Sequence, residues 1–149
     1  KLSPPLRTEN DRLALVEAIS DGVIDVIVSD HKPQDEESKR LTFAQAATGA
    51  TGVETLLPLA LELFHNKSIG LKQLISTITS NPAKILGINK GSLDKGNDAD
   101  LCIFDINKPW IVDKENLKSK SKNTPIENRK LQGQVLKTFV KGELAYQNI

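Results

Sequence analysis

The sequence has 149 residues and contains no methionine, one cysteine and two histidines. Because methionine is missing even at the first position, we expect that this is not an unprocessed translation product. The single cysteine, Cys102, excludes a disulfide within the chain and suits a reducing cytosol. It lies in the apolar run Leu101–Phe104, where we expect a small buried hydrophobic side chain rather than a nucleophile.

Charge and hydropathy exclude two further classes of protein. The formal net charge is +1, and no basic run is long enough for dedicated nucleic-acid binding. No apolar stretch approaches the roughly 20 residues of a membrane span. The chain also lacks a Walker or Rossmann phosphate loop, a cysteine pair and a Gly-x-Ser-x-Gly motif. We therefore expect a soluble, cytoplasmic protein whose partners include neither nucleic acid nor membrane.

The most informative stretch that is present ends in an acid. Val26–Val28 has no alternating polar residue, which predicts a strand buried on both faces. Pro33 cannot donate to a strand ladder, so the strand has to end close after Asp30. Asp30 is then expected at the carboxyl end of a buried parallel strand, where α/β barrels place their chemistry. An Asp there needs a metal ion, a cation or amide donors, or else it caps the next turn; the residues leave both open.

The two histidines are poorly placed to help Asp30 bind a metal ion. His31 follows Asp30 directly, so their side chains point to opposite faces of a strand, and His31 is expected to brace the strand. His65 falls near the end of an amphipathic helix, where a structural role is expected. A zinc site needs three or four ligands, and Asp30 is the one convincing candidate.

Residues 1–90 alternate helices with at least one strand, which predicts an α/β fold. Thr8 with Asp11 forms a capping pattern before a helix. A strand is expected over residues 23–29, and a polar loop over residues 32–40. Further helices are predicted from apolar periodicity or from a cap and a closing glycine, over residues 43–47, 54–66, 68–80 and 81–87, the last with Asn81 as its cap.

Residues 91–149 have a β character. Apolar runs predict short strands at residues 101–104 and 109–112 and a terminal hairpin over residues 135–146. Between them lies a long polar segment, residues 113–131; a loop of this length usually has a function or covers something. The residues alone indicate the carboxyl-terminal part of an α/β enzyme with one catalytic acid, and no particular reaction.

A series of motifs resembles the last barrel strands of the amidohydrolase superfamily. In chain order they are Lys1–Arg7, Asp21-Gly22, Ile24-Asp25, Ser29–Pro33, Gly52–Leu59, Asn81–Gly87 and Gly91–Leu101. Within that superfamily, Ser119–Pro125 looks like the dihydroorotase family of the barrel type that includes the bacterial long-chain enzymes. Allantoinases and hydantoinases share the Ser-Asp-His-x-Pro and Pro-Pro patterns, so these two patterns do not separate the three activities.

The resemblance implies an α/β fold in two parts. Residues 1–90 would be the carboxyl-terminal part of a (β/α)₈ TIM-type barrel, from about the seventh strand, with Asp30 ending the eighth. Residues 91–149 would supply half of a small composite β-sandwich domain, with a long return loop. The family binds one or two zinc ions through histidines and a bridging carboxylate or carboxylated lysine from earlier strands, which are not among these residues. The 149-residue segment alone is therefore expected to fold poorly and to be inactive.

The function implied is metal-dependent, reversible cyclisation of N-carbamoyl-L-aspartate to dihydroorotate in pyrimidine biosynthesis. Asp30 would be a metal ligand and the general acid/base, taking a proton during attack on the ring amide and passing it to the departing nitrogen.

Three departures from the family pattern fall among the expected substrate-binding residues. Gln34 replaces a histidine that grips the substrate carboxylate, Ser3 replaces an asparagine at the ring, and Thr48-Gly49 replaces a Pro-Gly pair. An uncharged Gln34 would weaken binding several-fold, since hydrogen bonds to charged groups are worth about 1.5–3 kcal/mol against about 0.5–1.5 kcal/mol for neutral ones.

Two alternatives to a dihydroorotase stay open at this point. One is an inactive dihydroorotase-like subunit that scaffolds aspartate transcarbamoylase. The other is an allantoinase or hydantoinase, which Ser119–Pro125 disfavours. Besides a small-molecule substrate, a homo-oligomer or aspartate transcarbamoylase are the partners considered.

Overall fold

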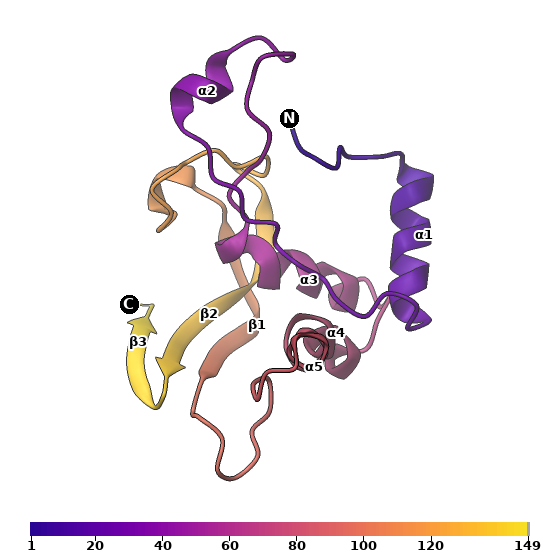
Figure 1. Cartoon of the computed structure of the whole chain (residues 1–149), viewed down its shortest axis with the longest axis vertical. Coiled ribbons are helices and arrows are strands. Elements are labelled where there is room, and N and C mark those ends of the chain that lie inside the picture. Colours follow the sequence, from indigo (N-terminus) through magenta and orange to yellow (C-terminus); the bar gives the residue numbers. More distant parts are fainter. Residues whose placement is uncertain (149) are drawn as a thin grey trace.

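The computed structural model describes residues 1–148 and consists of helices followed by a small antiparallel sheet (Figure 1). All of its α-helices precede Gly87, and all of its strands follow Asp100. The elements in chain order are α1 (Glu9–Ser20), α2 (Glu36–Arg40), the 3₁₀ turn η1 (Val53–Thr55), α3 (Leu56–His65), α4 (Leu71–Ile78), α5 (Ser80–Leu86), β1 (Leu101–Ile111), the 3₁₀ turn η2 (Lys114–Asn116), β2 (Lys130–Val140) and β3 (Glu143–Gln147).

The predicted cap of α1 is confirmed. The Asp11 amide donates to the Thr8 hydroxyl at 3.3 Å, and the Thr8 amide donates to the Asp11 carboxylate at 3.0 Å. This reciprocal pair satisfies amides at the start of the helix. Because the Thr8 hydroxyl and amide both donate to the Asp11 carboxylate, the pKa of that carboxyl is lowered. The other end of α1 is tied to α4, where Gln73 donates to the carbonyls of Ile19 and Ser20.

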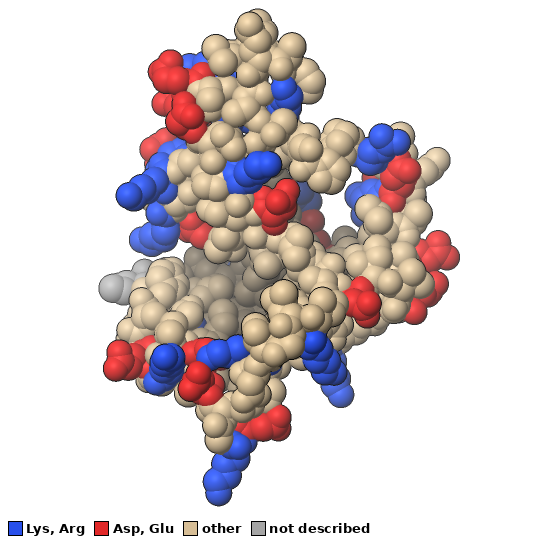
Figure 2. All heavy atoms as spheres, viewed as in Figure 1, with Lys and Arg blue, Asp and Glu red and all other residues tan. Residues whose placement is uncertain are grey.

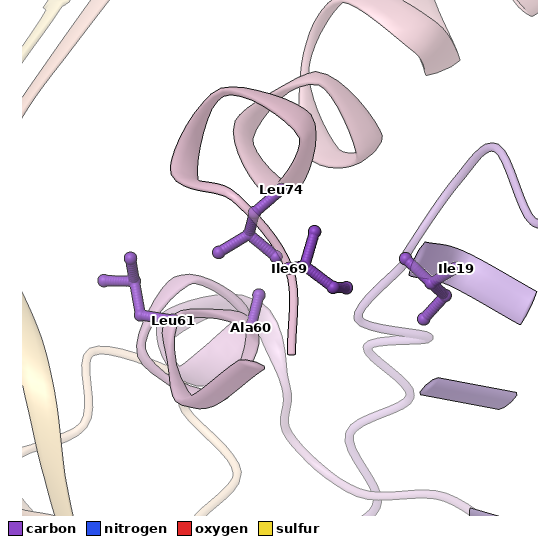
Figure 3. Close-up of a cluster of buried hydrophobic side chains, with 5 residues drawn as sticks. All are labelled: Ile19, Ala60, Leu61, Ile69 and Leu74. Atoms are coloured by element: carbon purple, nitrogen blue, oxygen red, sulfur yellow. The ribbon is translucent and has the colours of Figure 1, made fainter. Parts of the chain in front are cut away.

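The hydrophobic core lies where α1, α3 and α4 meet. Figure 3 shows its members: Ile19 from α1, Ala60 and Leu61 from α3, Ile69 from the α3–α4 connection and Leu74 from α4. Leu61 and Leu74 are fully buried. Burial of each of these side chains stabilises the folded state by roughly 1.5–3 kcal/mol relative to its exposure in water. The core therefore holds the helical half of the chain together.

A glycine lets α3 pack closely on the sheet. Gly133 of β2 has φ +103°, and a Cβ there would stand 2.3 Å from the Leu61 Cδ1 atom. The Trp110 indole of β1 donates to the Gly133 carbonyl at 3.0 Å. His65, at the end of α3, is hydrogen-bonded to the Ile106 carbonyl of β1 at 3.0 Å, which confirms its structural role.

The sheet has the order β1-β2-β3 and is antiparallel throughout. Leu101 pairs with Phe139 and Trp110 with Leu131, so the two short strands predicted over residues 101–104 and 109–112 are parts of one strand with an irregularity between Asp105 and Pro109. The predicted hairpin is confirmed by the pairing of Thr138 with Tyr146.

Three local predictions for residues 23–47 are wrong. Residues 23–29 are assigned neither helix nor strand, and Val28 is exposed; the Ile27 amide instead donates to the Thr77 carbonyl of α4 at 3.0 Å. A strand exists only through a partner strand, and none of the described strands lies beside this segment. The polar loop contains the helix α2, because Asp35 caps it through the Ser38 amide at 2.8 Å. Residues 43–47 form turns rather than a helix.

Two single residues also differ from expectation. Asn81 is not a helix cap but lies inside α5, and its side chain donates to the Asp25 carbonyl at 2.9 Å. Gly87, in the left-handed conformation at φ +65°, does close that helix as predicted. Cys102 is exposed rather than buried.

Charge is dispersed over the surface. Acidic and basic side chains are interspersed on the face shown in Figure 2, and neither sign forms a continuous patch there. Within residues 1–148, none of the helices has both the length and the apolar character that crossing a membrane requires.

Large apolar side chains are exposed in residues 1–90, which predicts that the 149 residues expressed alone will aggregate or remain molten. Leu6 is 82% exposed, Phe43 77% and Val28 71%. Exposed apolar side chains in such number promote association in water. Thermal unfolding followed by circular dichroism should show no sharp transition, and a hydrophobic dye should bind at room temperature. A cooperative transition of a monomer would contradict this.

Candidate active site

Asp30 has the geometry of an available acid. Its backbone is in the left-handed region at φ +42°, which Asp tolerates better than most residues. Among residues 1–148 no group donates to its carboxylate, and no cation pairs with it. The turn-capping alternative is therefore not what the structure shows, since Asp35 caps the following helix. The Asp30 carboxylate is therefore free to bind a ligand.

Asp30 borders a cavity of about 590 Å³ that reaches down to the hydrophobic core. Two of the other predicted site residues, Ser3 and Gly49, line the same cavity. Its remaining wall is mainly apolar and includes Leu15, Val16, Ile27, Leu56 and Leu59. An apolar cavity with few polar groups at one side is the usual form of a small-molecule site. The structure therefore brings Asp30, Ser3 and Gly49 together.

Gly49 sits where only a glycine fits. Its φ is +126°, and a Cβ there would stand 2.4 Å from the Lys32 carbonyl oxygen. Next to Gly49, the segment around Lys32 is joined to the segment around Ala50, because the Lys32 amide donates to the Ala50 carbonyl at 2.9 Å. A second close approach lies at Gly52, where a Cβ would stand 2.6 Å from the Ser29 carbonyl oxygen. The backbone around Asp30 is thus fixed against residues 49–52.

His31 holds this arrangement together, although the strand that it was expected to brace is not formed. Its Nδ1 atom accepts hydrogen bonds from the amides of Gly52 and Val53, at 3.1 and 3.3 Å. An accepting Nδ1 carries no proton, so in the neutral ring the proton is on Nε2. The contacts hold the start of η1 and leave His31 outside the cavity lined by Asp30.

Gln34 and Thr48 lie outside that cavity and bind each other. The Gln34 side-chain amide donates to the Thr48 carbonyl at 3.0 Å. The Gln34 backbone amide donates to the Asn123 side-chain oxygen at 3.2 Å, and its carbonyl accepts from the Ser121 hydroxyl at 2.5 Å. Gln34 borders a different, polar depression. It lies between α2 and the segment that connects β1 to β2, residues 112–129, called the return segment below. Its side chain is therefore engaged with protein rather than directed at Asp30.

Two further residues that form hydrogen bonds around Gly49 could not be identified from the sequence as site residues. Lys39 of α2 donates to the carbonyls of Ala47 and Gly49, at 3.0 and 3.1 Å. Asn123 donates to the Gly49 carbonyl at 2.9 Å. Asn123 lies in the Ser119–Pro125 motif, which does not distinguish it from its neighbours as a site residue, and no sequence signal distinguishes Lys39 from other surface lysines.

Glu54 fixes the return segment at another point. Its carboxylate accepts from the backbone amides of Lys118 and Ser119, at 2.9 and 3.1 Å. These contacts could not be predicted from the sequence, because the partners are 64 and 65 positions away along the chain.

Asp30 fits a metal ion as a single ligand. Its carboxylate is exposed, unpaired among the described residues and adjacent to a cavity. Within residues 1–148, however, no three His, Cys, Asp or Glu side chains come together as a metal site. Any further ligands therefore have to come from outside these residues.

The chain is similar to known proteins in sequence and in structure. The model of the amidohydrolase family matches residues 3–145. Dihydroorotases of Ehrlichia canis and Ehrlichia chaffeensis are 48% and 47% identical over 146 residues, which are 98% of this chain and 33% of each relative. The solved L-hydantoinase (dihydropyrimidinase) of Arthrobacter aurescens matches with a TM-score of 0.92 and 33% identity, over 99% of this chain and 34% of that one.

Two conclusions follow from these matches. The resemblance and the fold class predicted from the sequence motifs, a partial (β/α)₈ barrel followed by strands of a small β domain, are confirmed. The chain spans about a third of the length of the curated relatives that it matches.

Proposed function

Because the chain belongs to the amidohydrolase family, we propose that it is part of a dihydroorotase, which interconverts N-carbamoyl-L-aspartate and dihydroorotate in pyrimidine biosynthesis. The observation that carries the proposal is the free carboxylate of Asp30 at a cavity that Ser3 and Gly49 also line. The relatives named dihydroorotase support this choice of substrate, since they are more similar in sequence than the hydantoinase is.

Asp30 has the role of general acid/base in this proposal. Its carboxylate accepts a proton as water attacks the ring amide and then returns the proton to the departing nitrogen. No cation pairs with it among the described residues, so its oxygens are open to the substrate. Zinc, as one or two ions, is the metal that we propose for the site; Asp30 would supply one ligand, and the bound metal makes water nucleophilic near neutral pH.

Ser3 and Gly49 are the proposed contacts to the substrate ring. Ser3 offers a hydroxyl, and Gly49 supplies a part of the cavity wall that has no side chain. Gln34 and Thr48, predicted as substrate contacts, bind each other outside the cavity, so we propose that they act on the substrate through the position of Gly49. Residues 1–90 would contribute the barrel part of the site and residues 91–149 the strands of the β domain.

The setting of the enzyme is also proposed. A cytoplasmic location agrees with a single cysteine, Cys102, which excludes a disulfide within the chain. A homo-oligomer or a complex with aspartate transcarbamoylase would be detected by measuring the mass of the complete protein in solution, alone and mixed with the transcarbamoylase.

Substrate turnover by the complete protein tests the assignment. With zinc supplied, we expect the highest kcat/KM on dihydroorotate and lower values on hydantoin and dihydrouracil. The structural likeness to a hydantoinase makes hydantoin the informative competitor. A higher kcat/KM on hydantoin would assign the protein to that activity. No turnover by well-folded protein would favour the inactive scaffold.

A further inference from the structure

Asn123 joins three segments that are far apart in the sequence. Its side-chain oxygen accepts from the Gln34 amide at 3.2 Å and from the Ser121 hydroxyl at 2.6 Å. Its side-chain nitrogen donates to the Gly49 carbonyl at 2.9 Å. Its backbone carbonyl accepts from the Thr51 amide at 2.9 Å. One partly buried amide thus links the segment after Asp30, the cavity wall and the return segment.

The Gly49 peptide is held from several sides. Its carbonyl accepts from both Asn123 and Lys39, and its amide donates to the Lys1 carbonyl at 3.0 Å. Lys1 lies two positions before Ser3, so the same contact fixes the segment that carries Ser3. Both proposed ring contacts therefore depend on bonds made outside the cavity.

The network does not include the acid itself. Within the described part of the chain, no hydrogen bond runs from the Asp30 carboxylate to Asn123, Lys39 or Gln34. Gln34 contributes to the network through its side-chain amide, which donates to the Thr48 carbonyl. A defect at Asn123 should consequently displace the wall that faces the substrate and leave the acid/base group in place.

We propose that Asn123, from the return segment between β1 and β2, is a positioning residue for substrate binding: its side chain fixes the Gly49 wall of the cavity. This inference rests on the proposed function. It makes substrate affinity depend on residues of the β part of the chain, and it assigns Gln34 and Lys39 to the same supporting network rather than to direct contact with substrate.

Steady-state kinetics of the complete protein with dihydroorotate tests the proposal. Asn123→Ala removes all three side-chain hydrogen bonds, and Asn123→Asp keeps the acceptor while losing the donor to Gly49. We expect both variants to raise KM about three- to tenfold, the equivalent of one neutral hydrogen bond, with kcat changed less than about twofold. Asn116→Ala is the matched control, because Asn116 lies in the same return segment and contacts only Asp113 through its side chain.

The outcomes are distinguishable. Equal KM values for Asn123→Asp, Asn116→Ala and wild type would overturn the positioning role while leaving the proposed function standing. Absence of turnover in the wild type would overturn the proposed function instead. Amide hydrogen exchange then tests the Asn123 network independently of catalytic activity. Faster exchange at the Gly49 amide in Asn123→Asp than in Asn116→Ala supports the network, and equal exchange in the two variants contradicts it.

Discussion

Replacement of Asp30 by asparagine should lower kcat for dihydroorotate by about 10²–10⁴-fold, the range contributed by a positioned general acid/base. Asparagine has nearly the same shape, and it tolerates the left-handed backbone that Asp30 adopts at φ +42°. The asparagine side chain cannot take up a proton near neutral pH, so it cannot act as the general acid/base. Since no described residue donates to the Asp30 carboxylate, the substitution should leave the free energy of unfolding nearly unchanged.

Asp25→Asn is the matched control for this experiment. Asp25 is also exposed, lies five positions earlier on the same irregular segment, and uses only its backbone carbonyl in a hydrogen bond, to Asn81. It is not among the residues that line the cavity. Activity close to wild type in Asp30→Asn, or an equal loss in both variants, would show that Asp30 is not the acid/base group.

Gly49→Ala should combine a loss of stability with a loss of activity. Alanine at φ +126° is strained by about 1–3 kcal/mol. Its Cβ would stand 2.4 Å from the Lys32 carbonyl oxygen, whereas ordinary contact begins at 3.4 Å, so the wall has to move by about 1 Å. A misplacement of that size can cost about 10²-fold in rate. Chemical unfolding and kcat/KM of the complete protein measure the two effects.

Gly70→Ala separates the effect of geometry from the effect of adding a methyl group. Gly70 precedes α4 with an ordinary φ of −69°, and a Cβ there would meet nothing within 4 Å. This control should behave like the wild type in both measurements. If Gly49→Ala kept the activity and stability of Gly70→Ala, the close approach of residues 49 and 32 would not be needed for the site.

Local chemistry made part of the fold predictable. The Thr8 cap, the closing role of Gly87 and the terminal hairpin depend on residues that are close in sequence, and each is found in the structure. The strand expected at residues 23–29 failed for the opposite reason. Its apolar run decided neither burial nor pairing: Val28 is exposed, a strand is completed only by a neighbouring strand, and the Ile27 amide donates to α4 instead.

The candidate site was predictable where a motif carries chemistry and not where contacts decide it. Asp30 stood out because an acid at the end of an apolar run needs a reason to be there. Gln34 was assigned to substrate because of the position it occupies in a motif, yet its partners are Thr48 and Asn123, 14 and 89 positions away. The residue type alone does not indicate whether a glutamine amide binds substrate or forms hydrogen bonds within the protein.

A crystal structure of the complete protein with zinc and dihydroorotate would test the central claim most directly. We expect the ring in the cavity lined by Ser3 and Gly49, with the Asp30 carboxylate on the metal and within hydrogen-bond distance of the scissile amide. Dihydroorotate bound instead in the polar depression beside Gln34, with Asp30 remote from both metal and ring, would contradict the assignment of the site.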